Sequence, residues 1–188
     1  MNRTSIAHSY PAVRRELSFA VGYSDFIRAL DSLLGRMSID TVSSLTQDSP
    51  EKAREKLSAS MGVSSFALFQ KIDHGAILKA LTGRHVRAVT YVFGNPLIAS
   101  ELVKHEPMIG LYVPPRLFVG ELENGGTLAA YDVPSATFRQ FGSDAVDSAA
   151  ARLDAKVEKL VDVAAALAVK AGARKRGAPF TAEAGGRR

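Results

Sequence analysis

Asp73 and His74 are the first pair of side chains in this sequence that could carry out acid–base chemistry. They stand at the end of an expected strand over residues 65–73, and functional residues often lie on loops held by a rigid scaffold. A carboxylate and an imidazole can exchange a proton near neutral pH. Adjacent strand residues point to opposite faces, however, so the pair cooperates only if the strand has already turned. We favour the structural alternative, in which Asp73 caps a short helix beginning at Gly75 and His74 packs locally.

Gly94, Asn95 and Pro96 form a second candidate site between an expected strand and an expected helix over residues 96–105. A glycine turn before a helix N-terminus can bind a phosphate or a carboxylate. Known phosphate loops use more glycines, and neither the dinucleotide nor the P-loop pattern occurs here. In the structural interpretation, which we favour, Gly94 leaves the strand through unusual dihedral angles. Asn95 then caps the helix and Pro96 starts it.

Tyr112 and Tyr131 could line a pocket through their hydroxyl groups, and with Gly94 and Asn95 they make up the candidate ligand-binding residues. Glu101 and His105 share one face of a helix, but no spacing typical of metal ligands is present. The chain has no cysteine, which excludes thiolate catalysis and disulfides. We therefore predict no metal and no cofactor, and we lean against an enzyme.

The net charge of the chain is concentrated in its last residues. There are 24 basic and 19 acidic residues, a formal charge of +5. Residues 170–188 hold six basic residues and one acidic residue, so residues 1–169 carry 18 of each sign. This distribution argues against a nucleic-acid-binding domain and leaves only weak contact through the tail. No apolar run approaches the ~18 residues of a membrane span, so we expect a cytoplasmic protein without a membrane partner.

The first half of the sequence predicts one strand and two helices after a mobile N-terminus, residues 1–12. Residues 13–22 alternate loosely between apolar and polar, as in a half-buried strand. Ser24 and Asp25 offer an N-cap for a helix whose apolar stripe runs from Phe26 to Met37. A second, surface helix starts at Pro50, the position that a proline favours.

The second half predicts a sheet and a long helix. Four expected strands follow one another, at residues 65–73, 87–93, 116–122 and 127–132. Alternation in the first of these places Phe66, Leu68, Gln70 and Ile72 on one face. A short helical turn spans residues 75–81, and ENGG signals a hairpin.

From Ser143 the pattern is helical for about 28 residues. Apolar positions recur every three or four residues, namely Val146, Ala150, Leu153, Val157, Leu160, Ala164 and Leu167. This spacing fits a helix–helix seam or a helix packed along the sheet, and we favour the sheet because it needs a cover. Residues 171–188 are expected to form a basic, disordered tail.

Four segments, FALFQKIDHG, YVFGNPLIAS, IGLYVPPRLFVGE and GGTLAAYDVPSA, occur in an order that resembles the family called "domain of unknown function 302". The resemblance spans about residues 13–170 and implies a β-α-β(4)-α unit of the TATA-binding-protein-like fold group, often dimeric, without an agreed activity. Pro115 departs from the family pattern, which has an apolar residue there. Residues 38–62 then form a helical insertion; alternatively, residues 39–60 supply the first strand and helix, with residues 1–38 as an extension.

We therefore predict a single α+β domain over residues 13–170. Its sheet is mainly antiparallel and curved, with about five strands, and the long C-terminal helix packs on it. Two functions have equal weight: a small-molecule or apolar-ligand binding module with a pocket between sheet and long helix, and a homodimeric interaction domain whose interface is the long helix or a sheet edge. The remaining alternative is an enzyme of unknown reaction with His74 as general acid or base.

Overall fold

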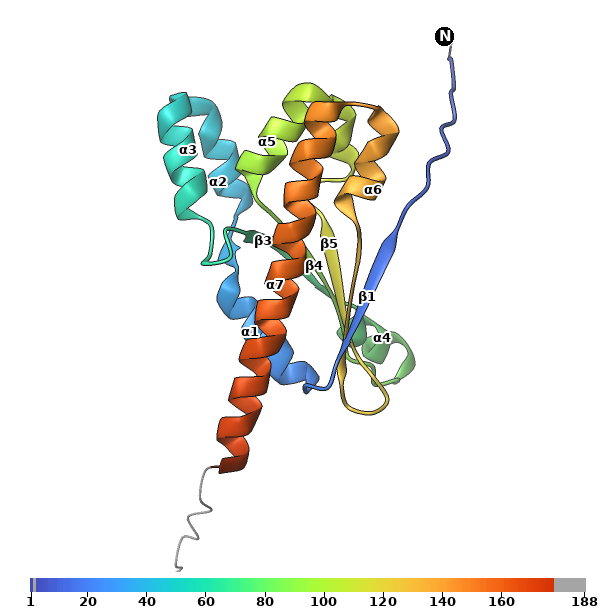
Figure 1. The fold of residues 1–188 in the computed structure, drawn as a ribbon, viewed down its shortest axis with the longest axis vertical. Coiled ribbons are helices and arrows are strands. Elements are labelled where there is room, and N and C mark those ends of the chain that lie inside the picture. The colour runs from blue at the N-terminus through green and yellow to red at the C-terminus, as the bar shows by residue number, and fades with distance from the viewer. Residues whose placement is uncertain (2, 178–188) are drawn as a thin grey trace, which may run out of the picture.

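The computed structural model describes residue 1 and residues 3–177, which form one mixed sheet covered by helices (Figure 1). The sheet has six strands in the order β1-β6-β5-β4-β3-β2. The strands are β1 (Arg14–Phe19), β2 (Gly35–Arg36), β3 (Ala67–Asp73), β4 (Ala88–Gly94), β5 (Arg116–Glu121) and β6 (Thr127–Asp132). Only the β2–β3 pairing is parallel. The prediction of a mainly antiparallel α+β domain is confirmed, with one strand more than expected.

Four helices pack together on one face of the sheet. They are α1 (Tyr23–Leu33), α5 (Pro96–His105), α6 (Pro134–Phe138) and α7 (Asp144–Gly177), and α7 contacts each of the other three. Beside the β2 edge lie α2 (Ile39–Ser44) and α3 (Pro50–Ala59), whereas α4 (His74–Thr82) follows β3 directly (Figure 1). Single-turn 3-10 helices span Leu45–Gln47, Pro107–Leu111 and Arg139–Phe141.

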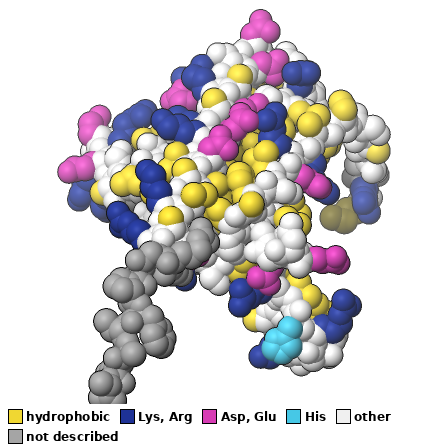
Figure 2. Space-filling model, turned by 60° about the horizontal axis from the view of Figure 1, so that its bottom comes forward, with side chains coloured by type: hydrophobic (Ala, Val, Ile, Leu, Met, Phe, Trp, Pro, Cys, Tyr) yellow, Lys and Arg dark blue, Asp and Glu magenta, His cyan; other side chains and the backbone are white. Residues whose placement is uncertain are grey.

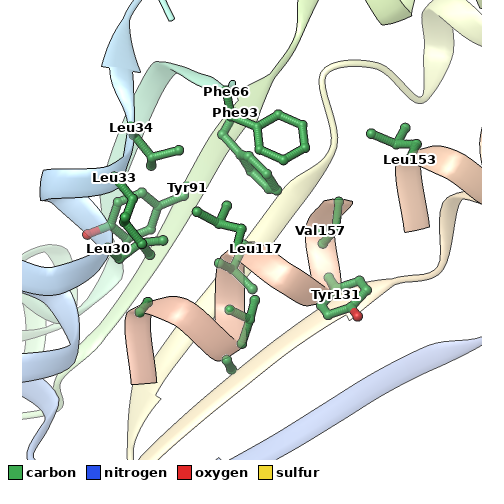
Figure 3. Packing of buried hydrophobic residues seen from close by; sticks show 14 of the residues in the cluster. Leu30, Leu33, Leu34, Phe66, Tyr91, Phe93, Leu117, Tyr131, Leu153 and Val157 are labelled. Carbon is green, nitrogen blue, oxygen red and sulfur yellow. The ribbon is translucent and has the colours of Figure 1, made fainter. Parts of the chain in front are cut away.

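The hydrophobic core lies between the sheet and the pair α1 and α7. Figure 3 shows side chains of both helices around Tyr91 and Phe93 of β4 and Leu117 of β5, which are fully buried. The apolar stripe predicted for α7 is buried from Val146 to Ala164, and only Leu167 is 37% exposed. The helix thus packs over the sheet as we favoured, and it also contacts α1, α5 and α6, so the helix–helix alternative applies in part.

The long helix continues beyond its expected end. It runs to Gly177, so residues 171–177 are helical rather than disordered. The remainder of the expected tail, residues 178–188, lies outside the described residues. Basic and alanine-rich residues propagate a helix well once it is nucleated, which explains why the composition alone was misleading.

The strand β3 contains a β-bulge that changes the predicted alternation. The pairing with β4 shifts between Leu68 and Gln70. Phe66 and Leu68 are buried in the core, whereas Gln70 is exposed on the opposite face. The expectation that these residues share one face is wrong, because the extra residue reverses the side to which the rest of the strand points.

The segment between α1 and β3 also differs from the prediction. The helix α1 begins at Tyr23, after Gly22, and has no side-chain cap, so Ser24 and Asp25 are not its N-cap. The chain then forms the short strand β2, which we did not expect. Residues 39–59 contain helices and no strand. The first strand is therefore β1, and the alternative that residues 39–60 supply it is wrong.

Candidate functional site

Asp73 and His74 have separate partners in the structure. Oδ1 of Asp73 accepts a hydrogen bond from the backbone N–H of Ala76 at 2.8 Å and so caps α4. Nε2 of His74 lies 2.9 Å from Oγ1 of Thr90, on the neighbouring strand β4. The capping role that we favoured for Asp73 is confirmed. The two side chains are not hydrogen-bonded to each other, and His74 is exposed.

Asn95 uses its side chain to hold the start of α5. Its Oδ1 accepts hydrogen bonds from the N–H groups of Leu97 and Ile98 at 2.9 and 3.1 Å, and its Nδ2 donates to the carbonyl of Ser65 at 2.9 Å. The predicted cap is confirmed. Because both ends of the amide are engaged within the protein, Asn95 has little hydrogen-bonding capacity for a ligand.

Gly94 is required by packing rather than by dihedral angles. The glycines with positive φ are Gly83, Gly125 and Gly142, so the expectation of an unusual φ at Gly94 is wrong. A Cβ atom at Gly94 would lie 3.3 Å from Cβ of Pro114, in the segment that leads into β5. The small residue lets these two segments approach each other.

The space between the sheet and α7 is filled by core side chains. Among the described residues, the cavity there measures about 20 Å³ and is lined by apolar groups such as Phe69, Leu102 and Leu153. This volume is about that of one water molecule. Within the described part of the chain, the ligand pocket expected between the sheet and the long helix is therefore absent, and that part of the prediction is wrong.

A larger hollow lies on the opposite, open face of the sheet, and we call it the open-face hollow. Its volume is about 470 Å³. The register aligns Thr90 of β4, Phe118 of β5 and Ala130 of β6 in one row across the sheet, ending at Glu16 of β1. The complete lining consists of Arg14, Glu16, Thr90, Arg116, Phe118, Leu128, Ala130, Tyr131 and Asp132. The floor is thus partly apolar and the rim is charged.

The two arginines of this hollow differ in their partners. Arg14 forms an ion pair with Asp132, with 3.4 Å between Nε and Oδ1. Arg116 is exposed, and its guanidinium has no hydrogen bond or ion pair with any residue that the structure describes. It also borders a second hollow of about 200 Å³, together with Tyr10 and Tyr112. Arg116 therefore stands where the two hollows meet, with its guanidinium donors unused.

Tyr112 and Tyr131, the two predicted tyrosines, lie in different surroundings. The ring of Tyr112 is part of an aromatic wall in the second hollow, with ring centroids 5.8 Å from Tyr10 and 6.2 Å from Phe138. Tyr131 borders the open-face hollow, but its side chain is only 5% exposed and lies near Val157 of α7 (Figure 3). Burial raises the pKa of its hydroxyl.

The predicted ligand-binding residues thus do not form one site. Tyr112 lies beside the hollows, whereas Gly94 and Asn95 hold the start of α5. Arg116 and Phe118 of the hollow were missed, although their alternation in the expected strand over residues 116–122 already placed them on one face.

The comparisons with known proteins identify the family. A model described as "Domain of unknown function DUF302" matches residues 41–177. The chain belongs to this family. The match begins after β1 and α1, although β1 pairs with β6 in the same sheet. The resemblance drawn from the four sequence segments is thereby confirmed.

A solved structure supports the same fold. It is the crystal structure of an uncharacterized conserved DUF302 protein from Bacillus stearothermophilus, with a TM-score of 0.57 and 17% sequence identity. The similarity covers 80% of this chain and 97% of that one. At this identity the likeness concerns the fold alone. No curated protein matches the chain. Within the described residues, no helix combines the length and apolarity needed to cross a membrane.

Proposed function

We propose that this protein is a binding module that holds a small anionic molecule with an apolar part in the open-face hollow. The observation that carries this proposal is the position of Arg116, which borders both hollows and has no partner among the described residues. The guanidinium group presents a planar fork of N–H donors that matches a carboxylate or a phosphate.

The surroundings of Arg116 favour a ligand with an apolar part. Phe118, Leu128 and Ala130 form a half-buried floor next to the guanidinium group. The volume of about 470 Å³ falls within the roughly 300–1,000 Å³ that is typical of small-molecule sites. An apolar group on the floor and an acidic group on Arg116 would satisfy both kinds of surface.

The charge of the rim favours a ligand with a single negative charge. Arg14 and Arg116 contribute two cations, and Glu16 and Asp132 contribute two carboxylates. Asp132 already neutralises Arg14, so only Arg116 offers an uncompensated positive charge. A polyphosphate would find a single unpaired cation in this rim and would be repelled by Glu16, which disfavours it.

The test is calorimetric titration with a panel of monoanions, namely hexanoate, benzoate and phenyl phosphate. We expect at least one to bind, and Arg116→Gln to weaken its binding at least tenfold. Arg84→Gln is the matched control, because Arg84 is exposed outside both hollows and its guanidinium has no hydrogen bond or ion pair with any described residue. Equal binding by the two variants, or no binding by the unmodified protein, would contradict the proposal.

A homodimer through the same face is the second candidate. Half-buried apolar residues such as Val92, Phe118 and Leu128 lie on an uncovered sheet face, and a rim with two cations and two carboxylates can pair with a two-fold related copy of itself. Light scattering distinguishes the candidates: Leu128→Arg would convert a dimer to a monomer, whereas a ligand-binding monomer keeps its mass. The alternative with His74 as general acid or base stays a prediction.

A further inference from the structure

A second surface, distant from the open face, follows the outer side of α7. Helical spacing aligns six exposed residues along it, with steps of three or four: Lys156, Lys159, Val163, Leu167, Lys170 and Arg174. We call this set the α7 stripe. Residues at this spacing share one face of a helix, so the stripe combines two apolar side chains with four cations.

The cations of the α7 stripe are not engaged in ion pairs. Lysine and arginine side chains elsewhere, such as Arg15, Lys71 and Arg87, have carboxylate partners. None of the four stripe cations has one among the described residues. Glu158, a carboxylate on the same helix, is bonded instead to Arg15 of β1 at 2.7 Å. Asp162 lies on the flank of the helix, three residues after Lys159. The stripe itself therefore contains two pairs of cations, with two apolar side chains between them, and no carboxylate.

A largely apolar groove runs beside Lys156 and Lys159, the first two residues of the stripe. It has a volume of about 320 Å³ and lies between α7 and the loop of residues 63–65. Leu33 and Leu160 form its buried bottom, at 7% and 2% exposure, and Val163 borders it. Val63 lines the groove on the side opposite α7 and is 83% exposed. Figure 2 shows one face of the molecule, on which hydrophobic side chains lie next to Lys and Arg side chains.

We infer that the groove and the α7 stripe bind an acidic amphipathic helix of a partner protein. Apolar side chains spaced three or four residues apart on that helix enter the groove between Val63 and Val163. Its carboxylates then pair with Lys156 and Lys159. This is the helix-in-groove mode of recognition, in which one face of an amphipathic helix supplies the anchors.

The observations disfavour three other occupants. A second copy of this chain would bring its own four cations against these four. A lipid surface is flat and could not reach Leu33 and Leu160 at the bottom of the groove, which only an inserted side chain contacts. Nucleic acid would use the cations, but its charged phosphate backbone, which dominates such binding, offers no apolar partner to Val63, Val163 and Leu167.

The test is selection of binders from a display library of random 16-residue peptides, with Lys156→Glu/Lys159→Glu for counter-selection. We expect the remaining peptides to be enriched in Asp and Glu around apolar residues at i, i+3 or i, i+4. Synthetic copies of the selected peptides should bind at least tenfold more weakly to the protein variants Lys156→Glu/Lys159→Glu and Val63→Asp than to the unmodified protein. The matched control Lys79→Glu/Lys104→Glu makes the same change of charge at two other exposed lysines and should bind as the unmodified protein does.

Two further probes separate the other occupants. Vesicles with 30% phosphatidylserine and a 20-base-pair DNA duplex are mixed with the unmodified protein and the same three variants. Binding to either probe that Lys156→Glu/Lys159→Glu removes, without any enrichment of acidic amphipathic peptides, overturns the inference. Selection of peptides without such a pattern, or equal losses in the control variant, overturns it as well. The chain has no cysteine, so a fluorophore on Val63→Cys gives an independent signal of groove occupancy.

Discussion

The two faces of the sheet differ in whether their polar side chains have partners within the protein. On the helix-covered face, the hydroxyl of Tyr91 donates to Asp31 at 2.8 Å, and Nζ of Lys71 lies 2.9 Å from the same carboxylate. On the open face, Arg116 has no such partner within the described chain. These polar groups of the covered face thus bond to each other, whereas on the open face, where Arg14 pairs with Asp132, the guanidinium of Arg116 is available to a ligand.

The aromatic residues of the two faces should differ most in their contribution to stability. Phe93 is fully buried on the covered face, with its ring 5.2 Å from that of Phe66, whereas Phe118 on the open face is half-buried. We expect Phe93→Ala to lower the free energy of unfolding by about 3–5 kcal/mol, and Phe118→Ala by about 1 kcal/mol, since less apolar surface leaves the interior. Urea unfolding followed by circular dichroism measures both. Equal losses would mean that the open face is covered in solution.

The carboxylate on the covered face should matter next. Asp31→Ala removes the acceptor of the Tyr91 hydroxyl and the partner of Lys71. Because the hydroxyl is left unsatisfied in a buried position, we expect a loss of about 1–3 kcal/mol. The double variant Asp31→Ala/Tyr91→Phe is the control and should recover part of this loss. No recovery would show that the hydrogen bond is not the source of the effect.

The pH dependence of stability provides a third test of the covered face. Burial, and then the hydrogen bond to Asp31, raise the pKa of Tyr91 above its ordinary value. The unfolded chain ionises this tyrosine near pH 10 while the folded protein keeps it neutral. Its contribution to stability is therefore complete below that pH and declines above it, by about 1.4 kcal/mol per pH unit.

The corresponding measurement compares urea unfolding at pH 9 and pH 11. Tyr91→Phe should lose less stability between the two values than the unmodified protein does, since one buried tyrosine no longer resists ionisation. Burial also raises the pKa values of Tyr23 and Tyr131. Both proteins should therefore still lose some stability between pH 9 and pH 11. An identical decline would show that the Tyr91 hydroxyl is accessible to water.

The ion pair of the open face should have the smallest effect on folding. The side chains of Arg14 and Asp132 are 65% and 53% exposed, and pairs of this kind contribute about 0–1 kcal/mol. We expect Asp132→Asn to change the free energy of unfolding by less than about 0.5 kcal/mol. The same substitution should strengthen anion binding measured by calorimetry, because Arg14 loses its carboxylate partner and can then pair with the anion. Weaker binding would mean that Asp132 itself contacts the ligand.

The elements predicted correctly are those whose signals are local. The helix start at Pro50 and the caps Asp73 and Asn95 each depend on residues at most three positions apart, so the order of side chains was sufficient. The strand β2 was missed because it depends on contacts between distant parts of the chain. A Cβ at Gly35 would lie 2.1 Å from the carbonyl oxygen of Ser60, an approach that no local pattern reveals.

The site was harder to predict than the fold for a similar reason. The alternation of Arg116 and Phe118 places them on one face of a strand, but alternation does not say which face the helices cover. The bulge after Leu68 further reversed part of β3. We therefore expected a pocket under the long helix, where the core is in fact closed, and overlooked the hollow on the other side.

The measurement that tests the central claim most directly is an amide NMR titration with the monoanion that binds best. We predict chemical-shift changes centred on β5 and β6, around Arg116, Phe118 and Leu128, that disappear in Arg116→Gln and persist in Arg84→Gln. The amides of α7 and the core should not move. Changes centred on α7 or α5, or the same changes in Arg116→Gln, would contradict the account of an open face that serves as the binding surface.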